Sequence, residues 1–156
     1  MAPLGAEDDH FPRTLTERTG FLLSMLGQAS RNTTERVLAP LGIKPHHYGV
    51  LVVLDAMGPA PQHSVGERLG IDKSSMTVVV DHLEGLGMLE RRRNPGNRRA
   101  YELTLTATGR ETLARAAPLI ASVEEVVLAR LTVEERAQLH GLLVRTLPGV
   151  TVPGGS

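Results

Sequence analysis

The segment from Ser64 to Thr106 constrains the fold of this 156-residue chain more than any other. A short segment with apolar residues at helical spacing is followed by a turn at Gly70. A second helix-length segment runs from Lys73 to Leu86, and two strand-like runs around an Arg-rich turn follow it. This order predicts a helix-turn-helix with a basic β-hairpin. Such a unit can place one helix in a DNA major groove and a loop beside it on the backbone.

The first helix and the turn after it are short. Val65, Leu69 and Ile71 can anchor this helix in a core, and Gly70 supplies the tight turn. Asp72 comes next, and its carboxylate can accept the free N–H groups at the start of the following helix. We therefore expect Asp72 to be an N-cap.

The second helix has two contrasting faces. Three- and four-residue spacing predicts one buried stripe of Met76, Val79, Val80, Leu83 and Leu86. The opposite face carries Ser74, Ser75, Thr77, Val78, Asp81 and His82, with Lys73 at the helix start. Short hydroxyls and a Lys can approach base edges and phosphates closely. The run of valines favours a strand locally, but the segment is long for a strand and its apolar spacing is helical.

The basic hairpin is predicted to pair strands Leu89–Arg93 and Arg99–Leu105 around a tip from Asn94 to Arg98. Overall charge does not favour nucleic acid, because Lys+Arg and Asp+Glu both number 17. The local charge does, since the stretch from Leu89 to Arg99 holds five Arg and one Glu, a net charge of +4. We expect this positive field to act on a partner at the hairpin.

Helices are expected on both sides of this unit. Residues 14–39 read as a first helix, and Pro45 opens a second that runs through Met57. Residues 58–63 form a loop with a short extra strand that can pair with the hairpin. A long helix over 106–130 should be interrupted or bent near Pro118. Thr132 and Glu135 form a capping box that opens the last helix, which ends at Leu147.

Composition excludes several classes of protein. The chain has no Cys, which rules out disulfide scaffolds, Cys-zinc sites and thiol-based redox sensing. No apolar run reaches transmembrane length and no signal peptide is evident, so we expect a soluble cytoplasmic protein without membrane contact. The six His lack metal-ligand spacing, and no nucleophile motif or nucleotide-binding glycine loop is present. We therefore predict no catalytic residues, no metal site and no cofactor.

Three segments together resemble the MarR family of bacterial transcription regulators, which are winged helix-turn-helix dimers. They are LAPLGIKPHHYGVLVVLDAMGPA, LGIDKSSMTVVVDHLEGLGMLERR and RRAYELTLTATGRE. The resemblance runs from Thr14 to Leu147. Two positions depart from the family pattern: Val78 stands where an Arg is common in the recognition helix, and Asn97 stands where an Asp is common in the wing.

The predicted fold is mainly α with a small β-hairpin wing. Residues 40–106 form the winged helix-turn-helix DNA-binding domain, and residues 14–39 and 107–147 form N- and C-terminal dimerisation helices. A flexible arm (1–13) and a disordered tail (148–156) flank them. The terminal helix has more leucines than its own core needs, which with the resemblance favours a homodimer. They are Leu131, Leu139, Leu142, Leu143 and Leu147.

The predicted function is a dimeric regulator that binds an inverted repeat in double-stranded DNA. The resemblance further implies a repressor that a small molecule releases, and we expect a phenolic or aromatic-acid effector. The predicted DNA-binding residues are Lys73, Ser74, Ser75, Thr77, Val78, His82, Arg91, Arg93, Asn97, Arg98 and Arg99. The predicted effector-binding residues are Leu22, Met25, His47, Tyr48 and Leu51, although these could equally be ordinary core.

Two other functions stay open at this point. Val78 and the neutral net charge are consistent with a regulatory protein-interaction module whose winged helix binds DNA weakly. A small metal-dependent enzyme is the third alternative.

Overall fold

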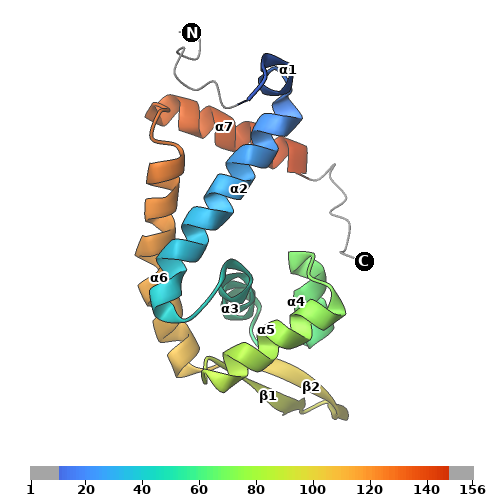
Figure 1. The fold of residues 1–156 in the computed structure, drawn as a ribbon. Coiled ribbons are helices and arrows are strands. Elements are labelled where there is room, and N and C mark those ends of the chain that lie inside the picture. The colour runs from blue at the N-terminus through green and yellow to red at the C-terminus, as the bar shows by residue number, and fades with distance from the viewer. Residues whose placement is uncertain (1–10, 148–156) are drawn as a thin grey trace.

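The computed structural model describes residues 11–147, apart from the Arg98 side chain. Helices predominate, and the strands of this part of the chain form one two-stranded antiparallel sheet, so the predicted fold class is confirmed (Figure 1). The elements in chain order are α1 (Arg13–Thr16), α2 (Thr19–Leu38), a 3-10 turn (Ala39–Leu41), α3 (Pro45–Met57), α4 (Gln62–Leu69), α5 (Lys73–Gly85), β1 (Leu89–Asn94), β2 (Asn97–Leu105), α6 (Ala107–Val127) and α7 (Val133–Thr146).

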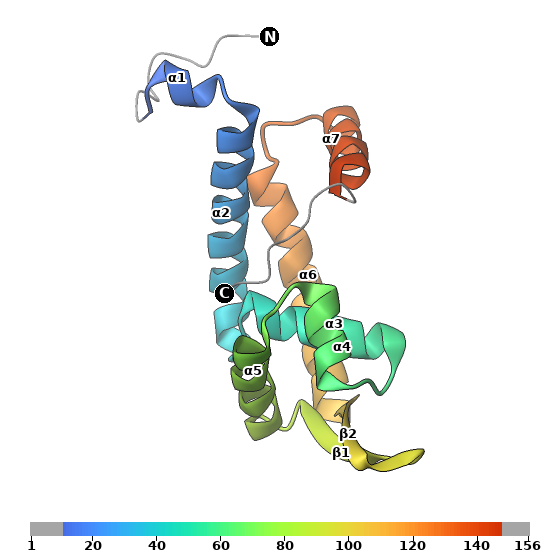
Figure 2. The same ribbon diagram turned by 90° about the vertical axis from the view of Figure 1, so that its right-hand side faces the viewer.

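Different helices and strands lie at the two ends of the molecule. Helix α2 descends from α1, and α6 returns beside it in the opposite direction (Figures 1 and 2). Helix α7 lies with α1 and the start of α2 at one end. The α4–α5 pair and the β1–β2 hairpin lie at the other end. The helix-turn-helix and the wing are therefore held at one end of a long helical support.

The helix-turn-helix end has a core made mainly of aliphatic side chains from α3, α4, α5 and the hairpin, joined by Leu38 of α2, Ile43 and Ala116 of α6. Its largest fully buried side chains are Leu38, Ile43, Leu51, Leu54, Met76, Leu83, Leu89, Leu103, Val50, Val65 and Val80. Burial of this many aliphatic groups is the main force that fixes α5 against α3. Gly70 adopts φ of 63° between α4 and α5, which confirms the predicted turn, because a side chain there would be strained.

The hairpin is longer and its tip is tighter than the sequence predicts. Leu89 pairs with Leu105, Arg91 with Leu103, and Asn94 with Asn97, so only Pro95 and Gly96 form the tip. The predicted extra strand in the loop before α4 is confirmed as a single bridge. The Ala60 N–H donates to the Leu103 carbonyl at 3.1 Å, and the Leu103 N–H donates to the Ala60 carbonyl at 2.8 Å.

The helix predicted over residues 14–39 is divided. A break at Glu17 and Arg18 separates α1 from α2, and a 3-10 turn replaces the last residues before Gly42. Helix α6 runs through Pro118 without a break, so the predicted interruption does not occur, and the bend predicted as its alternative stays a prediction. The capping box at Thr132 and Glu135 is confirmed, with both reciprocal hydrogen bonds present.

Leu86 is not part of the buried stripe of α5, because it is 41% exposed. The helix ends at Gly85, so the helical periodicity that placed Leu86 on the buried face no longer applies there. The predicted stripe is correct for Met76, Val79, Val80 and Leu83, all of which are buried.

Most of the predicted flexible arm and all of the predicted tail lie outside the described residues, although Arg13 of the arm begins α1. The domain boundaries at 40 and 106 remain predictions. No single helix within residues 11–147 is long and apolar enough to cross a membrane. A bent pair, Thr19–Leu41 with Pro45–Met57 at 75°, meets that criterion by length and composition alone.

Candidate nucleic-acid interface

Asp72 is the N-cap of α5, as the sequence predicts. Its Oδ1 accepts the Ser75 N–H at 2.9 Å and the Ser74 hydroxyl at 2.6 Å. These hydrogen bonds from Ser74 and Ser75 hold the pKa of Asp72 well below its usual range. Asp72 therefore keeps its charge and fixes the first turn of the helix, while the Ser74 hydroxyl proton is already engaged.

The exposed face of α5 carries most of the residues predicted to face DNA. Lys73, Ser75 and Val78 are exposed, and Val78 is the most exposed of the large apolar residues on this helix, at 69%. The Thr77 hydroxyl donates to the Lys73 carbonyl at 3.0 Å and accepts from Gln62 Nε2 at 3.2 Å. Thr77 thus joins α4 to α5 and still lies on the open face.

His82 is committed to a contact within the protein. Its Nε2 donates to the Gly42 carbonyl at 2.9 Å, because a carbonyl can only accept. Its ring stacks on His47 with centroids 4.5 Å apart. His47 is 7% exposed, and its Nδ1 accepts the Lys44 N–H at 3.1 Å. His82 therefore anchors α5 to the segment that leads into α3 and to His47.

The electrostatic environment of His47 favours the neutral ring. Burial lowers its pKa to about 4, and the nearby positive charges of His82, Lys44 and His46 act in the same direction. A neutral ring is what the contact requires, since a protonated Nδ1 cannot accept the Lys44 N–H.

Arg91 also forms its contacts within the protein, with two acidic residues of α5. Its guanidinium pairs with Asp81 at 2.5 Å and with Glu84, and its backbone N–H donates to Glu84 Oε1 at 3.0 Å. Burial alone would lower the pKa of Arg91, but the hydrogen bonds to Asp81 and Glu84 raise it. Its side chain is 28% exposed. The DNA contact predicted for Arg91 stays a prediction, although this guanidinium already has two acidic partners within the protein.

The tip of the wing is shaped by two asparagines. Asn94 Oδ1 accepts the N–H groups of Gly96 at 2.7 Å and Asn97 at 3.1 Å, and its Nδ2 donates to Glu102 at 2.6 Å. Asn97 Oδ1 accepts the Arg99 N–H at 3.1 Å. At position 97 an amide oxygen thus holds the Arg99 backbone where the family pattern has a carboxylate.

The arginines of the hairpin differ in their surroundings. Arg92 is paired with Glu90 at 2.5 Å on the same strand, and the Arg93 guanidinium lies 5.5 Å from the centre of the Tyr101 ring. Arg99 is exposed on β2, and Arg98 precedes it. The positive charge of the wing is therefore concentrated toward its tip.

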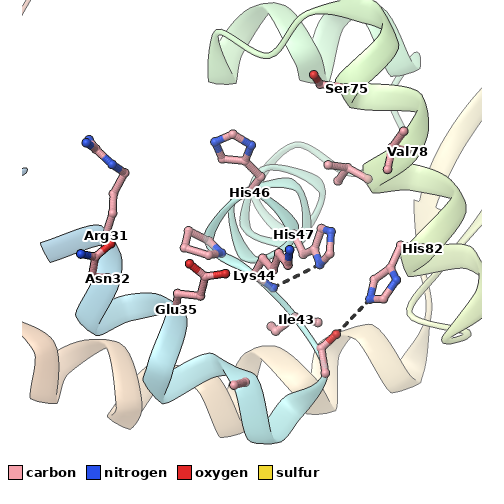
Figure 3. A pocket seen from close by; sticks show the side chains of 14 residues that line it. Arg31, Asn32, Glu35, Ile43, Lys44, His46, His47, Ser75, Val78 and His82 are labelled. Carbon is pink, nitrogen blue, oxygen red and sulfur yellow. Dashed lines mark hydrogen bonds between the residues drawn. The ribbon is translucent and has the colours of Figure 1, made fainter. Parts of the chain in front are cut away.

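Of the five residues predicted to bind an effector, Leu22 and Met25 lie on α2 and the other three lie on α3, in different surroundings. Leu51 is fully buried in the core, Tyr48 is packed against that core, and Leu22 is 45% exposed on α2. Of the five, His47 lines a cavity of about 880 Å³ between α2, the start of α3 and α5 (Figure 3). This cavity is also lined by Arg31, Glu35, Ile43, Lys44, His46, Ser75, Val79 and His82.

Several contributing residues were not predicted as part of the site. Asp81 and Glu84 are three residues apart on α5 and therefore share a face, which was a visible signal for a basic partner. Asn94, Gln62 and the Gly42 carbonyl gave no comparable signal. Within the described residues, no three His, Asp or Glu side chains are grouped closely enough to hold a metal ion.

Comparison with known proteins agrees with this geometry. A family model described as the MarR family matches residues 41–100. A Thauera aromatica protein named as a transcriptional regulatory protein for the hcr operon is 32% identical over 117 residues, which cover 75% of this chain and 70% of that protein.

Solved structures extend the similarity to the whole fold. The repressor CouR bound to a 23-mer DNA duplex matches with a TM-score of 0.79 and 32% identity, covering 85% of this chain and 94% of that chain. CouR is also known bound to p-coumaroyl-CoA. A MarR variant from Escherichia coli complexed with operator DNA matches with a TM-score of 0.75 and 26% identity, covering 83% and 93% of the two chains. The recognition helix, the basic wing and these relatives together show that the chain belongs to the MarR family of winged helix-turn-helix transcription regulators.

Proposed function

We propose that this protein is a homodimeric repressor that binds an inverted repeat in double-stranded DNA and leaves it when a small aromatic acid or phenol binds. The observation that carries the proposal is the common placement of α5 and the wing at one end of the molecule (Figure 1). There α5 exposes Lys73, Ser75 and Val78, and the wing exposes Arg99. A helix in the major groove with a basic loop beside it needs such an arrangement.

The proposed contacts are divided between base edges and phosphates. Lys73 holds a phosphate, and Val78 packs on a thymine methyl group in the groove. The hydroxyls of Ser74 and Thr77, whose protons are already donated within the protein, accept at nearby base edges, and the Ser75 hydroxyl accepts or donates there. Arg93, Asn97, Arg98 and Arg99 serve the wing at the backbone or in the minor groove. The proposed partner is chromosomal DNA, so we place the protein in the cytoplasm.

Dimer formation is supported by exposed apolar side chains at the end away from the wing. Those of α1, α2 and α7 include Leu15 (40% exposed), Leu22 (45%), Leu23 (44%), Leu142 (58%), Leu143 (43%) and Val144 (54%). An exposed patch of this composition favours association. A two-fold dimer would present two α5 helices to half-sites about 10 base pairs apart.

Sedimentation and DNA titration test these two parts separately. The wild-type protein should sediment as a dimer at micromolar concentration and bind the region upstream of its own gene with a steep salt dependence. Leu142→Glu should shift the mass to that of a monomer. Leu86→Glu, the same change at an exposed leucine near the wing (41% exposed, against 58% for Leu142), should leave the dimer intact. A monomeric wild-type protein would disprove the dimer.

The cavity beside His47 is our proposed effector site. It borders α2 and α5, so a ligand inside it contacts both the helical support and the recognition helix (Figure 3). Lys44 and Arg31 supply positive charge for a carboxylate or phenolate, and Ile43 and Val79 supply apolar walls for a ring. Such a ligand releases DNA only if it binds the DNA-incompetent arrangement more tightly than the competent one.

Salicylate-like compounds titrated into the protein–DNA complex test this site. We expect them to release DNA at up to millimolar concentration from the wild type and from Arg115→Ala, which changes an exposed cation on α6. Lys44→Gln should need more ligand. Equal response of Lys44→Gln and wild type would place the effector elsewhere, and no release by any aromatic acid or phenol would refute this ligand class.

The exposure of Val78 supports a second candidate function. A large apolar side chain that is 69% exposed, where the family commonly has an Arg, also suits a protein contact. The alternative is a regulatory protein-interaction module whose winged helix binds DNA weakly. Binding to upstream DNA that is no tighter than to unrelated DNA, at 150 mM salt, would favour this alternative.

A further inference from the structure

Arg91 joins the wing to the recognition helix. It lies on β1, while both of its acidic partners lie on α5, one turn apart. Glu84 binds it twice, because its Oε1 accepts the Arg91 backbone N–H and its Oε2 accepts the guanidinium. Asp81 accepts from the other end of the guanidinium at 2.5 Å. Three hydrogen bonds from one residue therefore cross between the two elements that would touch DNA.

The exposure of these three side chains indicates that their ion pairs mainly orient the wing and add little to the folding free energy. The Asp81 and Glu84 side chains are 60% and 38% exposed, and ion pairs that exposed add little to folding free energy. A planar guanidinium between two carboxylates nevertheless fixes the orientation of β1 relative to α5, because each hydrogen bond is favourable only over a narrow range of angles. Only Leu86, Gly87 and Met88 connect α5 to β1, so this link controls the angle at a short joint.

We propose that Arg91 is a positioning residue: it sets the angle between the wing and α5, and covers two carboxylates that would otherwise face DNA phosphates, without binding a phosphate itself. The inference rests on the proposed DNA-binding function. If the wing is already held at the correct angle before binding, less conformational entropy is lost when the protein binds DNA. Loss of Arg91 would free the wing and uncover two negative charges at once.

The first experiment measures the angle in the protein without DNA. Because the chain has no Cys, Val78→Cys and Pro95→Cys place one spin label on α5 and one at the wing tip without competing thiols. Labelled chains are diluted with unlabelled chains, so that only distances within a protomer are measured. Arg91→Gln and Glu84→Gln should each broaden the distance distribution.

Arg92→Gln is the matched control, because Arg92 neighbours Arg91 but pairs with Glu90 of its own strand. We expect its distance distribution to match that of the wild-type background. A distribution that stays narrow in both Arg91→Gln and Glu84→Gln would overturn the proposal, since a phosphate-binding Arg would have no effect in the absence of DNA.

The second experiment uses a charge swap and DNA affinity. Arg91→Glu should weaken binding to the upstream duplex by about tenfold or more, through lost orientation and added negative charge. Arg91→Glu combined with Glu84→Arg restores an ion pair between β1 and α5 with unchanged net charge. We expect this double variant to recover to within about threefold of the wild type. A double variant as weak as Arg91→Glu would show that a phosphate needs the cation at position 91.

The two experiments keep this inference separate from the proposed function. Failure of the wild-type protein to bind the upstream duplex would count against the proposed function alone. The distance measurement on the free protein would still decide whether Arg91 fixes the wing. A normal wild-type affinity with an unrescued swap would overturn the inference and leave DNA binding established.

Discussion

The ring of His82 on the recognition helix stacks on the ring of His47 at the start of α3, with an angle of 23° between the two planes. The two residues are 35 positions apart in the sequence, and each fixes a different backbone group of the segment before α3. His82 holds the Gly42 carbonyl, and His47 holds the Lys44 N–H. The end of α2, the start of α3 and the recognition helix are thereby connected through two imidazoles.

This contact should make stability depend on pH. The pKa of His47 is about 4 in the folded protein and 6.5 in the unfolded chain, so the unfolded state takes up a proton first as pH falls. Stability from the neutral ring is complete above pH 6.5 and is lost progressively toward pH 4, by at most about 3 kcal/mol. Urea unfolding at pH 7.5, 6 and 5 measures this loss. His47→Gln retains an acceptor for Lys44 and should lose less stability over the same range; parallel pH profiles would contradict the assignment.

Gly109 should tolerate no side chain. A Cβ atom there would lie 2.1 Å from the Met88 carbonyl oxygen and 2.5 Å from Leu105 Cδ1, and the carbonyl belongs to the backbone that leads into β1. Gly109→Ala should therefore destabilise the protein by about 1–3 kcal/mol. Gly141→Ala, at a helical glycine with no atom within 4 Å of the added carbon, should not. Thermal unfolding of both variants checks the difference, and equal melting temperatures would refute the tight contact.

The wing should contribute to the salt dependence of DNA binding. Arg99→Ala should weaken binding and lower the slope of log K against log salt by about 0.9 if one phosphate contact is lost, and the double change with Arg98→Ala should lower it further. Arg115→Ala on α6 is the control cation. Fluorescence anisotropy between 50 and 300 mM salt provides the slopes. Unchanged affinity and slope in the double variant would remove the wing from the mechanism.

Val78 should determine how strongly the protein binds DNA of any sequence. Val78→Arg adds a positive charge to the exposed face of α5, so binding to unrelated DNA should tighten several-fold. Val78→Ala should weaken specific binding by about 1 kcal/mol if the valine packs on a thymine methyl group. Competition between upstream and unrelated duplexes measures both effects. If the wild type and both variants bind each duplex with the same affinity as one another, position 78 does not reach the groove.

Local patterns predicted the parts of the fold that depend on neighbouring residues. The caps at Asp72 and Thr132 and the turn at Gly70 were predictable because donor, acceptor and backbone lie within four positions of each other. Leu86 was placed incorrectly because periodicity cannot show where a helix ends. Pro118 was expected to disturb its helix, yet the helix is assigned continuously through it.

The candidate site was predictable only for residues whose position follows from their own helix, and not for residues placed by contacts between distant elements. The exposed face of α5 follows from its spacing alone. Arg91 was one of four hairpin arginines predicted to bind DNA, because its partners Asp81 and Glu84 approach it only when β1 folds against α5. For Leu51 and Tyr48 the sequence left pocket and core equally open, since an apolar residue in a core and one beside a cavity have the same sequence pattern.

The bridge between Ala60 and Leu103 lies at the same level of the hairpin as Arg91, which pairs with Leu103 from the other side. The base of the wing is therefore held by a third backbone segment and by the recognition helix together. Beyond this level none of the described side chains, those of residues 92–97 and 99–102, is buried. Substitutions that keep the turn should therefore change the surface of the wing with little loss of stability.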